Sequence, residues 1–260
     1  MARIDIGSGN IGFVEAGGGP ATPMILLHGV GSDKTVWHPQ LEYFAASRRT
    51  IAFDYPGYGQ SDPIPGADGE TFARAILAAM TALEVEEAHI CGLSLGGVIA
   101  ISMHAHSPQR CKSLILADTF ATHPEGQAIL DRSISASSEL GMRGLAEARV
   151  EALIAPGASD AVRAEVVETM SRIDPAAYAS GAKAVWLADQ RERVAAIACP
   201  TLILCGSEDR ITPPSLSDDL KHRIPHAALV EIAGAGHLSN LEQPDIFNRV
   251  LDGFLAGIED

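Results

Sequence analysis

The sequence predicts an α/β fold, in which a mostly parallel sheet carries helices on both faces and a helical segment is inserted into the core. Three observations lead to this fold class. Short apolar runs alternate with helical stretches through the first half of the chain, which is the pattern of βαβ units. Two further apolar runs follow near the C-terminus. Between the two halves lies a long stretch rich in Ala, Glu and Arg that contains no convincing buried strand.

The first predicted element is an antiparallel hairpin at the edge of the sheet. Its strands, 3–6 and 11–15, flank Gly7-Ser8-Gly9-Asn10, a turn composition that joins antiparallel strands. Six further strands are predicted because runs such as Met-Ile-Leu-Leu suit strands that helices cover on both faces. These six strands are 24–28, 50–53, 88–92, 112–117, 201–205 and 228–232.

The helical segment is predicted to span 122–193, so that 1–121 and 194–260 together form the core. Its helices are broken at Gly141, Pro156-Gly157 and Asp174-Pro175. Such open sheets bind ligands at the carboxyl ends of their strands. The insertion is therefore expected to form a cap over the ligand site.

Composition narrows the classes of partner. The 260 residues carry a formal net charge of −14, whereas proteins that bind nucleic acid or anionic membranes present a basic face. Because no apolar run has the length of a signal peptide or a membrane span, the cytoplasm is the expected location. The stretch 120–198 holds 8 of the 19 basic residues, so an anionic small-molecule substrate remains a candidate.

The cysteines and histidines predict neither a disulfide framework nor a metal site. Cys91, Cys111, Cys199 and Cys205 form no Cys-x-x-Cys pair, and most lie beside apolar runs, where a reduced thiol packs as a small hydrophobe. No cluster of His, Cys and carboxylate residues has the spacing of metal ligands. We therefore expect neither a metal nor a cofactor.

The strongest local motif is Gly92-Leu93-Ser94-Leu95-Gly96-Gly97. It follows a predicted strand and precedes the helical run 98–103, which is the context that a nucleophile elbow requires. The turn is so sharp that side chains at the flanking glycines would collide with their neighbours. Ser94 is therefore the predicted nucleophile, and the backbone amide of Leu95 is the first predicted oxyanion donor.

A serine hydroxyl needs a base, and His237 is the predicted one. It lies in Ala233-Gly234-Ala235-Gly236-His237, a glycine-rich loop between an apolar strand and a helix that starts near Pro244. The third member should be a carboxylate after a strand, and both Asp209 and Asp118 qualify. Glu208 is the weaker neighbour of Asp209.

The loop 28–32 should supply the second oxyanion amide, for which Val30 is the candidate. In the same loop, His28 is expected to brace the backbone. Trp37 and Trp186 are weak candidates for lining a substrate pocket, since plain packing is the commoner role of tryptophan at such positions.

Nearly the whole chain resembles the α/β-hydrolase superfamily. Four landmarks carry the resemblance in order: His28-Gly29, the turn Asp54 to Asp62, Gly92–Gly97, and Gly206 to Asp209 with Gly236-His237. The resemblance implies the α/β-hydrolase fold and a Ser94–His237–Asp209 triad, and it favours Asp209 over Asp118. The segments around Ser94 and His237 are similar to those of 3-oxoadipate enol-lactonases. The chain departs from that family at Tyr55-Pro56-Gly57-Tyr58, which affects the expected substrate.

The resemblance implies a serine hydrolase that cleaves a small-molecule ester or lactone through an acyl-enzyme, as a monomer or homodimer. Two alternatives use the same fold and triad: hydrolysis of a carbon–carbon bond in a vinylogous diketone, and ligand binding as a receptor. Selectivity should come from the insertion, and a carboxylate-bearing substrate is expected. Its candidate charge partners are Arg132, Arg143, Arg149 and Lys183.

Overall fold

The computed structural model describes residues 2–259, so the end residues 1 and 260 of the predicted core lie outside the described part. Its centre is an eight-stranded sheet in the order β1-β2-β4-β3-β5-β6-β7-β8. The hairpin β1–β2 lies at one edge and β2 is antiparallel to its neighbours, whereas the strands from β4 to β8 are parallel. The strands are β1 (Ala2–Asp5), β2 (Asn10–Ala16), β3 (Ala21–Leu27), β4 (Arg48–Phe53), β5 (Ala88–Leu93), β6 (Cys111–Ala117), β7 (Thr201–Gly206) and β8 (Ala228–Ile232).

The predicted fold class, with its edge hairpin and its six further strands, is confirmed. The boundaries differ by a few residues. The largest difference is in β3, which begins at Ala21 because this residue already pairs with Arg48 across an irregularity in the register. The apolar run that predicted this strand begins only at Met24, and the earlier pairing of Ala21 is made by backbone groups that the run does not reveal.

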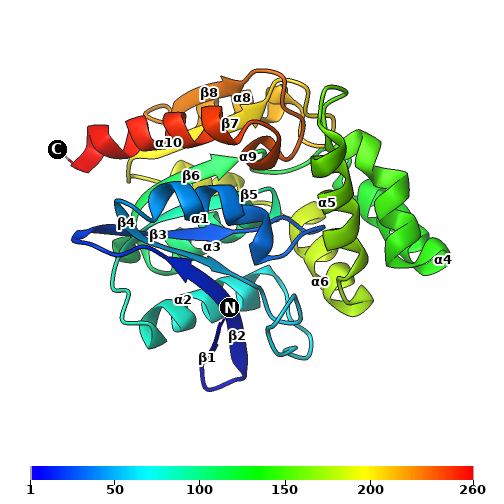
Figure 1. Cartoon of the computed structure of the whole chain (residues 1–260), viewed down its shortest axis with the longest axis horizontal. Coiled ribbons are helices and arrows are strands. Elements are labelled where there is room, and N and C mark those ends of the chain that lie inside the picture. The colour runs from blue at the N-terminus through cyan, green and yellow to red at the C-terminus, as the bar shows by residue number, and fades with distance from the viewer. Residues whose placement is uncertain (1, 260) are drawn as a thin grey trace.

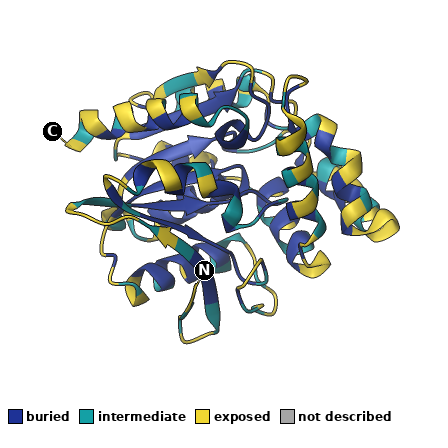
Figure 2. Cartoon of the chain, in the orientation of Figure 1, coloured by how far each residue is buried: buried dark blue, intermediate teal, exposed yellow. Residues whose placement is uncertain are grey.

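The central strands are buried on both faces, as their continuous apolar runs require. Every residue of β5 and β7 is buried, and the middle of the sheet is uniformly dark in Figure 2. The edge strand β8 is only partly buried. Removal of this apolar surface from water is the main stabilising contribution to the fold.

Helices cover both faces of the sheet (Figure 1). α1 and α10 contact each other on one face, whereas α2 and α3 contact each other on the other. The N-terminus of α2 is capped by Asp68, whose carboxylate accepts from the Thr71 amide at 2.8 Å. The helices of the core are α1 (His38–Phe44), α2 (Gly69–Ala82), α3 (Leu95–His106), α8 (Pro214–Arg223), α9 (Ser239–Glu242) and α10 (Pro244–Glu259), with 3₁₀ turns η1 (Lys34–Trp37) and η2 (Pro108–Arg110).

The segment between β6 and β7 is helical and lies beyond the carboxyl ends of the parallel strands (Figure 1). Gly141 interrupts its first helix with a φ of 67° and a ψ of 174°, and Asp174 caps the third. A single bridge between Thr122 and Asp189 joins the two ends of the segment. Its helices are α4 (Gly126–Leu153), α5 (Asp160–Ser171), α6 (Pro175–Trp186) and α7 (Arg191–Ala195).

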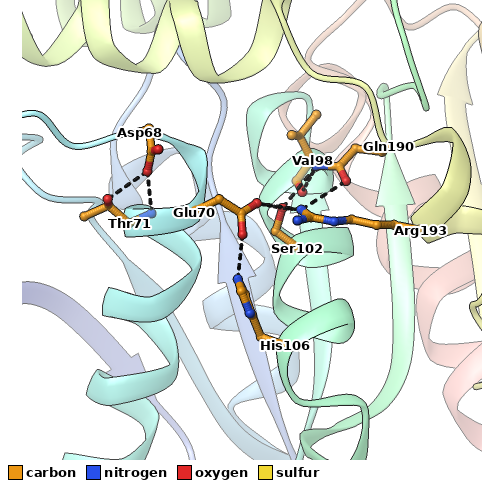
Figure 3. Close-up of polar contacts among 8 residues, drawn as sticks. All are labelled: Asp68, Glu70, Thr71, Val98, Ser102, His106, Gln190 and Arg193. Carbon is orange, nitrogen blue, oxygen red and sulfur yellow. Dashed lines mark hydrogen bonds and ion pairs between the residues drawn. The ribbon is translucent and has the colours of Figure 1, made fainter.

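A polar cluster ties α7 to the core helices α2 and α3 (Figure 3). The Arg193 guanidinium donates to a Glu70 oxygen at 2.5 Å and to the Ser102 hydroxyl at 2.9 Å. Gln190 donates to the same hydroxyl at 3.0 Å, and His106 contacts the other Glu70 oxygen at 2.6 Å. The end of the helical segment is therefore fixed to the helix that follows Ser94.

The thiols of Cys91, Cys111 and Cys205 are buried and that of Cys199 is partly exposed, and all four are free. Burial raises the pKa of Cys91 above its ordinary value, so this thiol is kept protonated. None of the helices in the described residues has both the length and the hydropathy needed to cross a bilayer.

Candidate active site

Ser94 occupies a strained turn between β5 and α3. Its backbone has a φ of 56° and a ψ of −114°, a conformation that side chains rarely adopt. A Cβ on Gly92 would lie 2.1 Å from the Gly96 carbonyl oxygen, and one on Gly96 would lie 2.0 Å from the carbonyl oxygen of Leu27. Both glycines of the motif are therefore required by close backbone contacts.

Two hydrogen bonds from the end of β6 hold this turn in place. The Ser94 amide donates to the Ala117 carbonyl at 2.9 Å, and the Thr119 hydroxyl donates to the Ser94 carbonyl at 2.8 Å. A Cβ on Gly97 would meet the Thr119 side chain at 2.5 Å. Thr119 was not a sequence candidate, because nothing local shows that the chain after β6 returns to the elbow.

The loop 28–32 lies directly beside Ser94. A Cβ on Gly29 would be 3.5 Å from the Ser94 Cβ, and Val30 and Ser94 line one cavity. The Tyr58 hydroxyl donates to the Val30 carbonyl at 3.2 Å, which fixes the peptide of the loop. Leu95 is the first residue of α3, so its amide has no acceptor within the helix. Both predicted oxyanion residues thus neighbour the serine.

His28 braces the loop from behind. Its Nδ1 donates to the Gly29 carbonyl at 2.8 Å, and its ring packs on Tyr55 and Tyr58 with centroid distances of 4.4 and 5.1 Å. The Tyr55 hydroxyl donates to the His28 carbonyl at 3.1 Å. Burial lowers the pKa of His28, so the ring is neutral near pH 7.

His237 and Asp209 are in direct contact. His237 Nδ1 donates to Asp209 Oδ2 at 2.8 Å, and both side chains are buried. The Asp209 carboxylate also accepts from the Thr212 hydroxyl at 2.6 Å and from the amides of Ile211 and Thr212 at 2.7 and 2.9 Å. Thr212 was not singled out from the sequence. Its position three residues after Asp209 is a signal that could have found it, because an aspartate side chain often accepts hydrogen bonds from residues two and three positions later in a turn.

The pKa values of this pair move apart. Burial alone would raise the pKa of Asp209, but the charge of His237 and the hydrogen bonds from His237 and Thr212 outweigh it and lower the pKa. Burial alone would lower the pKa of His237, but the Asp209 carboxylate outweighs it and raises the pKa. The carboxylate is therefore ionised and stabilises the imidazolium.

Glu242 holds the loop that carries His237. One of its oxygens accepts from the amides of Gly236 and Leu238 at 3.0 and 3.2 Å, and the other accepts from the Ala155 amide at 2.7 Å. The carboxylate therefore links the histidine loop to the chain that follows α4. Sequence reasoning missed Glu242, because its partners are backbone amides that no side-chain motif marks.

Asp118 does not contact His237 through a hydrogen bond. Its Oδ1 accepts from the Gly206 amide at 2.7 Å and its Oδ2 from the Ser239 hydroxyl at 2.5 Å. Burial, together with the neighbouring charge of Asp209, raises the pKa of Asp118 to about 8. The sequence left both Asp118 and Asp209 as candidates for the acid beside the histidine. In the structure Asp209 contacts His237, whereas Asp118 links the ends of β6, β7 and α9.

Ser94 and His237 meet in the wall of a small apolar cavity of about 40 Å³. Among the described residues no hydrogen bond joins the two side chains, and such bonds are often long until substrate is bound. The cavity is closed by the helical segment on one side and by the 28–32 loop on the other. Its other principal lining residues are Val36, Leu93, Leu153, Val166, Met170 and Leu241.

The two tryptophans have different roles. Trp186 lines the cavity and stacks on Phe120, with a centroid distance of 6.0 Å. Trp37 is not among the lining residues, so its predicted role in the pocket is not supported. Its ring is fully buried and packs on Phe247 of α10 at 6.2 Å, while Val36 of the same turn reaches the cavity instead.

The four basic residues that were predicted as charge partners for a substrate lie in different environments. Arg149 lines the cavity and donates to the Ser133 and Tyr178 hydroxyls at 3.0 and 2.9 Å. Arg143 faces outward, where it pairs with Glu147 and Glu168. Lys183 lines a separate depression beside Glu70, and Arg132 lines a larger neighbouring cavity.

Comparison with known proteins identifies the family of this chain and relatives that share its fold. The model of the alpha/beta hydrolase family matches residues 24–250. A 3-oxoadipate enol-lactonase of Acinetobacter baylyi is 27% identical over 241 residues, which are 92% of this chain and 90% of that protein. The crystal structure of the enol-lactonase from Burkholderia xenovorans LB400 superposes with a TM-score of 0.90 and 26% identity, covering 98% of this chain and 100% of that one. A thermophilic esterase from Thermogutta terrifontis gives a TM-score of 0.91 and 27% identity, covering 100% and 99% of the two chains.

Proposed function

Because this chain belongs to the alpha/beta hydrolase family, we propose that it is a serine hydrolase that cleaves a carboxylic ester or a lactone. Ser94 is the nucleophile, His237 the general base and Asp209 the acid that orients the histidine. The observation that carries this assignment is the 2.8 Å hydrogen bond from His237 to the buried Asp209, in a wall that His237 shares with Ser94. Relatives named as enol-lactonases and esterases support the reaction class.

The first half of the reaction forms an acyl-enzyme. Neutral His237 takes the proton of the Ser94 hydroxyl through Nε2 while the oxygen attacks the carbonyl carbon. Asp209 stabilises the resulting imidazolium. The amides of Leu95 and Val30 stabilise the negative charge that develops on the carbonyl oxygen, and the N-terminus of α3 adds a favourable dipole.

The second half releases the product. The tetrahedral intermediate collapses as the carbon–oxygen bond breaks, and His237 gives its proton to the departing alcohol. A water molecule, deprotonated by the now neutral His237, attacks the acyl-enzyme and restores the Ser94 hydroxyl. In a lactone the departing alcohol remains attached to the acyl group, so a single hydroxy acid is released.

The cavity favours a small substrate. Its volume of about 40 Å³ and its apolar lining suit a short acyl group, and the Arg149 guanidinium in its wall offers a partner for a carboxylate. A charge-assisted hydrogen bond of this kind contributes about 1.5–3 kcal/mol, which corresponds to about tenfold or more in specificity. We therefore expect small esters or lactones that bear a carboxylate to be preferred over neutral analogues of equal size.

The nucleophile is tested by covalent labelling. A fluorophosphonate probe should label Ser94, and Ser94→Ala should abolish both labelling and the hydrolysis of short aryl esters while the fold is retained by circular dichroism. Losses of several orders of magnitude are typical when the attacking residue of such a unit is removed. Ser32→Ala is the matched control, because Ser32 lines the same cavity without lying on the elbow. Labelling of another serine, with Ser94→Ala fully active, would disprove the assignment.

The reaction class is tested by a substrate panel. Values of kcat/KM are measured for an enol-lactone, a saturated lactone, short esters and a vinylogous diketone. The proposal expects the lactones or esters to give the highest values. A clear preference for the diketone would replace it with carbon–carbon hydrolysis, and tight ligand binding without turnover would replace it with a receptor.

A further inference from the structure

A second and larger cavity adjoins the catalytic cavity. It has a volume of about 560 Å³ and shares Arg149, Trp186 and Ile211 with the wall of the smaller one. Arg132 and Arg210 also line it. We call this space the arginine cavity, defined by Arg132, Arg149 and Arg210. Because it shares wall residues with the cavity that Ser94 and His237 line, it is a place for the part of a substrate that the small cavity does not hold.

Two carboxylates also line these cavities, Glu125 the larger and Glu165 the smaller, but neither is within ion-pair distance of the three arginines. Within residues 2–259, none of the three forms an ion pair, although the chain as a whole is acidic with a net charge of −14. Arginines elsewhere in the chain mostly do pair with Asp or Glu. The paired ones are Arg3, Arg48, Arg49, Arg143, Arg163, Arg172, Arg191, Arg193 and Arg223.

Neutral groups hold two of the three side chains. Arg149 donates to the hydroxyls of Ser133 and Tyr178, and Arg210 donates to the Glu151 carbonyl at 3.4 Å. These contacts orient the guanidinium groups without cancelling their charge. A guanidinium has donors in a planar fork that matches the oxygens of a carboxylate or phosphate, so the cavity is suited to an anion.

The wall that the two cavities share includes Ile211, which lies in the turn that holds Asp209. The Ile211 amide donates to Asp209 Oδ1 at 2.7 Å, and Asp209 Oδ2 accepts from His237 Nδ1, so the Nε2 atom of the ring is left to face the catalytic cavity. In the proposed reaction His237 gives its proton to the departing alcohol, so the leaving group must lie on the His237 side of the carbonyl. The acyl group is left to the small apolar cavity.

From this geometry we propose that the arginine cavity binds an anionic leaving group, an alcohol or thiol portion that carries a carboxylate or a phosphate. This inference rests on the proposed serine hydrolase function. It assigns the substrate as an ester, thioester or lactone whose acyl part is small and whose charge lies beyond the scissile oxygen or sulfur.

Matched esters test the charge. The full-length enzyme is assayed with 4-acetoxybenzoate and its neutral amide, 4-acetoxybenzamide, and each kcat/KM is divided by the rate of uncatalysed hydrolysis. The anionic ester should be preferred about tenfold or more, and the preference should weaken as salt is added. The ester 4-acetoxyphenyl phosphate shows whether the site favours phosphate over carboxylate.

Variants locate the preference. The double substitution Arg132→Gln with Arg210→Gln should lower the ratio of anionic to neutral ester severalfold, with Arg149 accounting for the preference that remains. Arg143→Gln should leave it unchanged, because Arg143 lies on the same helix as Arg132 and Arg149 but pairs with Glu147 and Glu168 outside the cavity.

A second pair of esters tests the orientation. It carries the charge on the acyl side, as 4-nitrophenyl hydrogen glutarate against its methyl ester. The proposal is overturned if this pair, rather than the first, shows the preference that depends on Arg132 and Arg210, or if neither pair distinguishes charge. Failure of the proposed function looks different: neutral 4-nitrophenyl acetate would not be hydrolysed, and the fluorophosphonate would not label Ser94.

Discussion

At the scale of single residues, two buried aspartic acids near the histidine loop differ in ionisation state. Asp209 accepts hydrogen bonds from two amides, a hydroxyl and the imidazole, and its pKa is lowered. Asp118 accepts from one amide and one hydroxyl in a fully buried site, and its pKa is raised to about 8. Near pH 7 only Asp209 therefore carries the negative charge that a general base needs beside it.

This difference predicts unequal effects of two conservative substitutions. Asp209→Asn should reduce kcat for an aryl ester by several orders of magnitude, because the amide presents a donor where His237 Nδ1–H needs an acceptor. Asp118→Asn should reduce it far less, since a protonated acid and an amide are similar in shape and hydrogen bonding. Steady-state kinetics at neutral pH measures both. The reverse ranking would assign the catalytic acid to the end of β6.

The pKa of His237 predicts the position of the acid limb of activity. Burial would lower this pKa, and the Asp209 carboxylate raises it further than burial lowers it. Because only the neutral imidazole accepts the serine proton, kcat/KM should increase with pH through a midpoint above about 6.5, the ordinary value for histidine.

Titration of the imidazole by NMR checks the cause. The midpoint for His237 should fall in Asp209→Asn, where burial acts without the compensating charge. A wild-type midpoint at or below the ordinary value would contradict the assigned environment.

At the scale of elements, the junction of β5 with α3 depends on backbone contacts that leave no room for a side chain. Gly96→Ala should strongly reduce the yield of folded protein, because the added Cβ would lie 2.0 Å from the Leu27 carbonyl oxygen. Relieving this contact would require β3 and α3 to move apart. Denaturant unfolding measures the loss for whatever protein folds.

Gly253→Ala is the control for the same chemical change. Gly253 lies in α10, where an added Cβ has no atom within 4 Å. There the substitution should stabilise the protein by about 0.5–1 kcal/mol, because alanine loses less backbone entropy in a helix. Equal tolerance of both substitutions would show that the elbow is not as tight as the contacts indicate.

At the scale of the whole molecule, the site is assembled at one edge of the sheet. Val30 follows β3, Ser94 follows β5, Asp209 follows β7 and His237 follows β8. Parallel strands end at the same edge, so Val30, Ser94 and His237 line one cavity although they lie far apart in the chain. The helical segment between β6 and β7 closes this edge and contributes Arg149 to the cavity wall.

The composition of this edge predicts independence from metal ions. Among residues 2–259 no group of three or more His, Cys, Asp or Glu side chains is arranged to hold a metal. Acyl transfer by serine, histidine and two backbone amides requires none. Turnover of aryl esters should survive prolonged dialysis against a chelator. A loss of activity that an added divalent metal restores would contradict this prediction.

The sequence by itself predicted the sheet and singled out Ser94 and His237, which line one cavity in the structure. Continuous apolar runs identify strands because burial on both faces demands them; all six strands predicted after the hairpin are present, although the edge strand β8 is only partly buried. Ser94 and His237 stand in local motifs whose glycines are needed by the backbone around them, so the requirement is visible in neighbouring residues.

Only the tertiary structure decided which side chains complete the site. Asp118 and Asp209 both follow strands, and the sequence does not show which of them contacts His237. The hydrogen bond that distinguishes them joins Asp209 to His237, 28 residues later in the chain. Trp37 and Trp186 look alike in the sequence, yet one ring faces α10 and the other the cavity. Arg143 and Arg149 share a helix but face opposite environments. The physical reason is the same in each case: the direction of a side chain and its burial are set by packing between distant elements, which the local sequence does not contain.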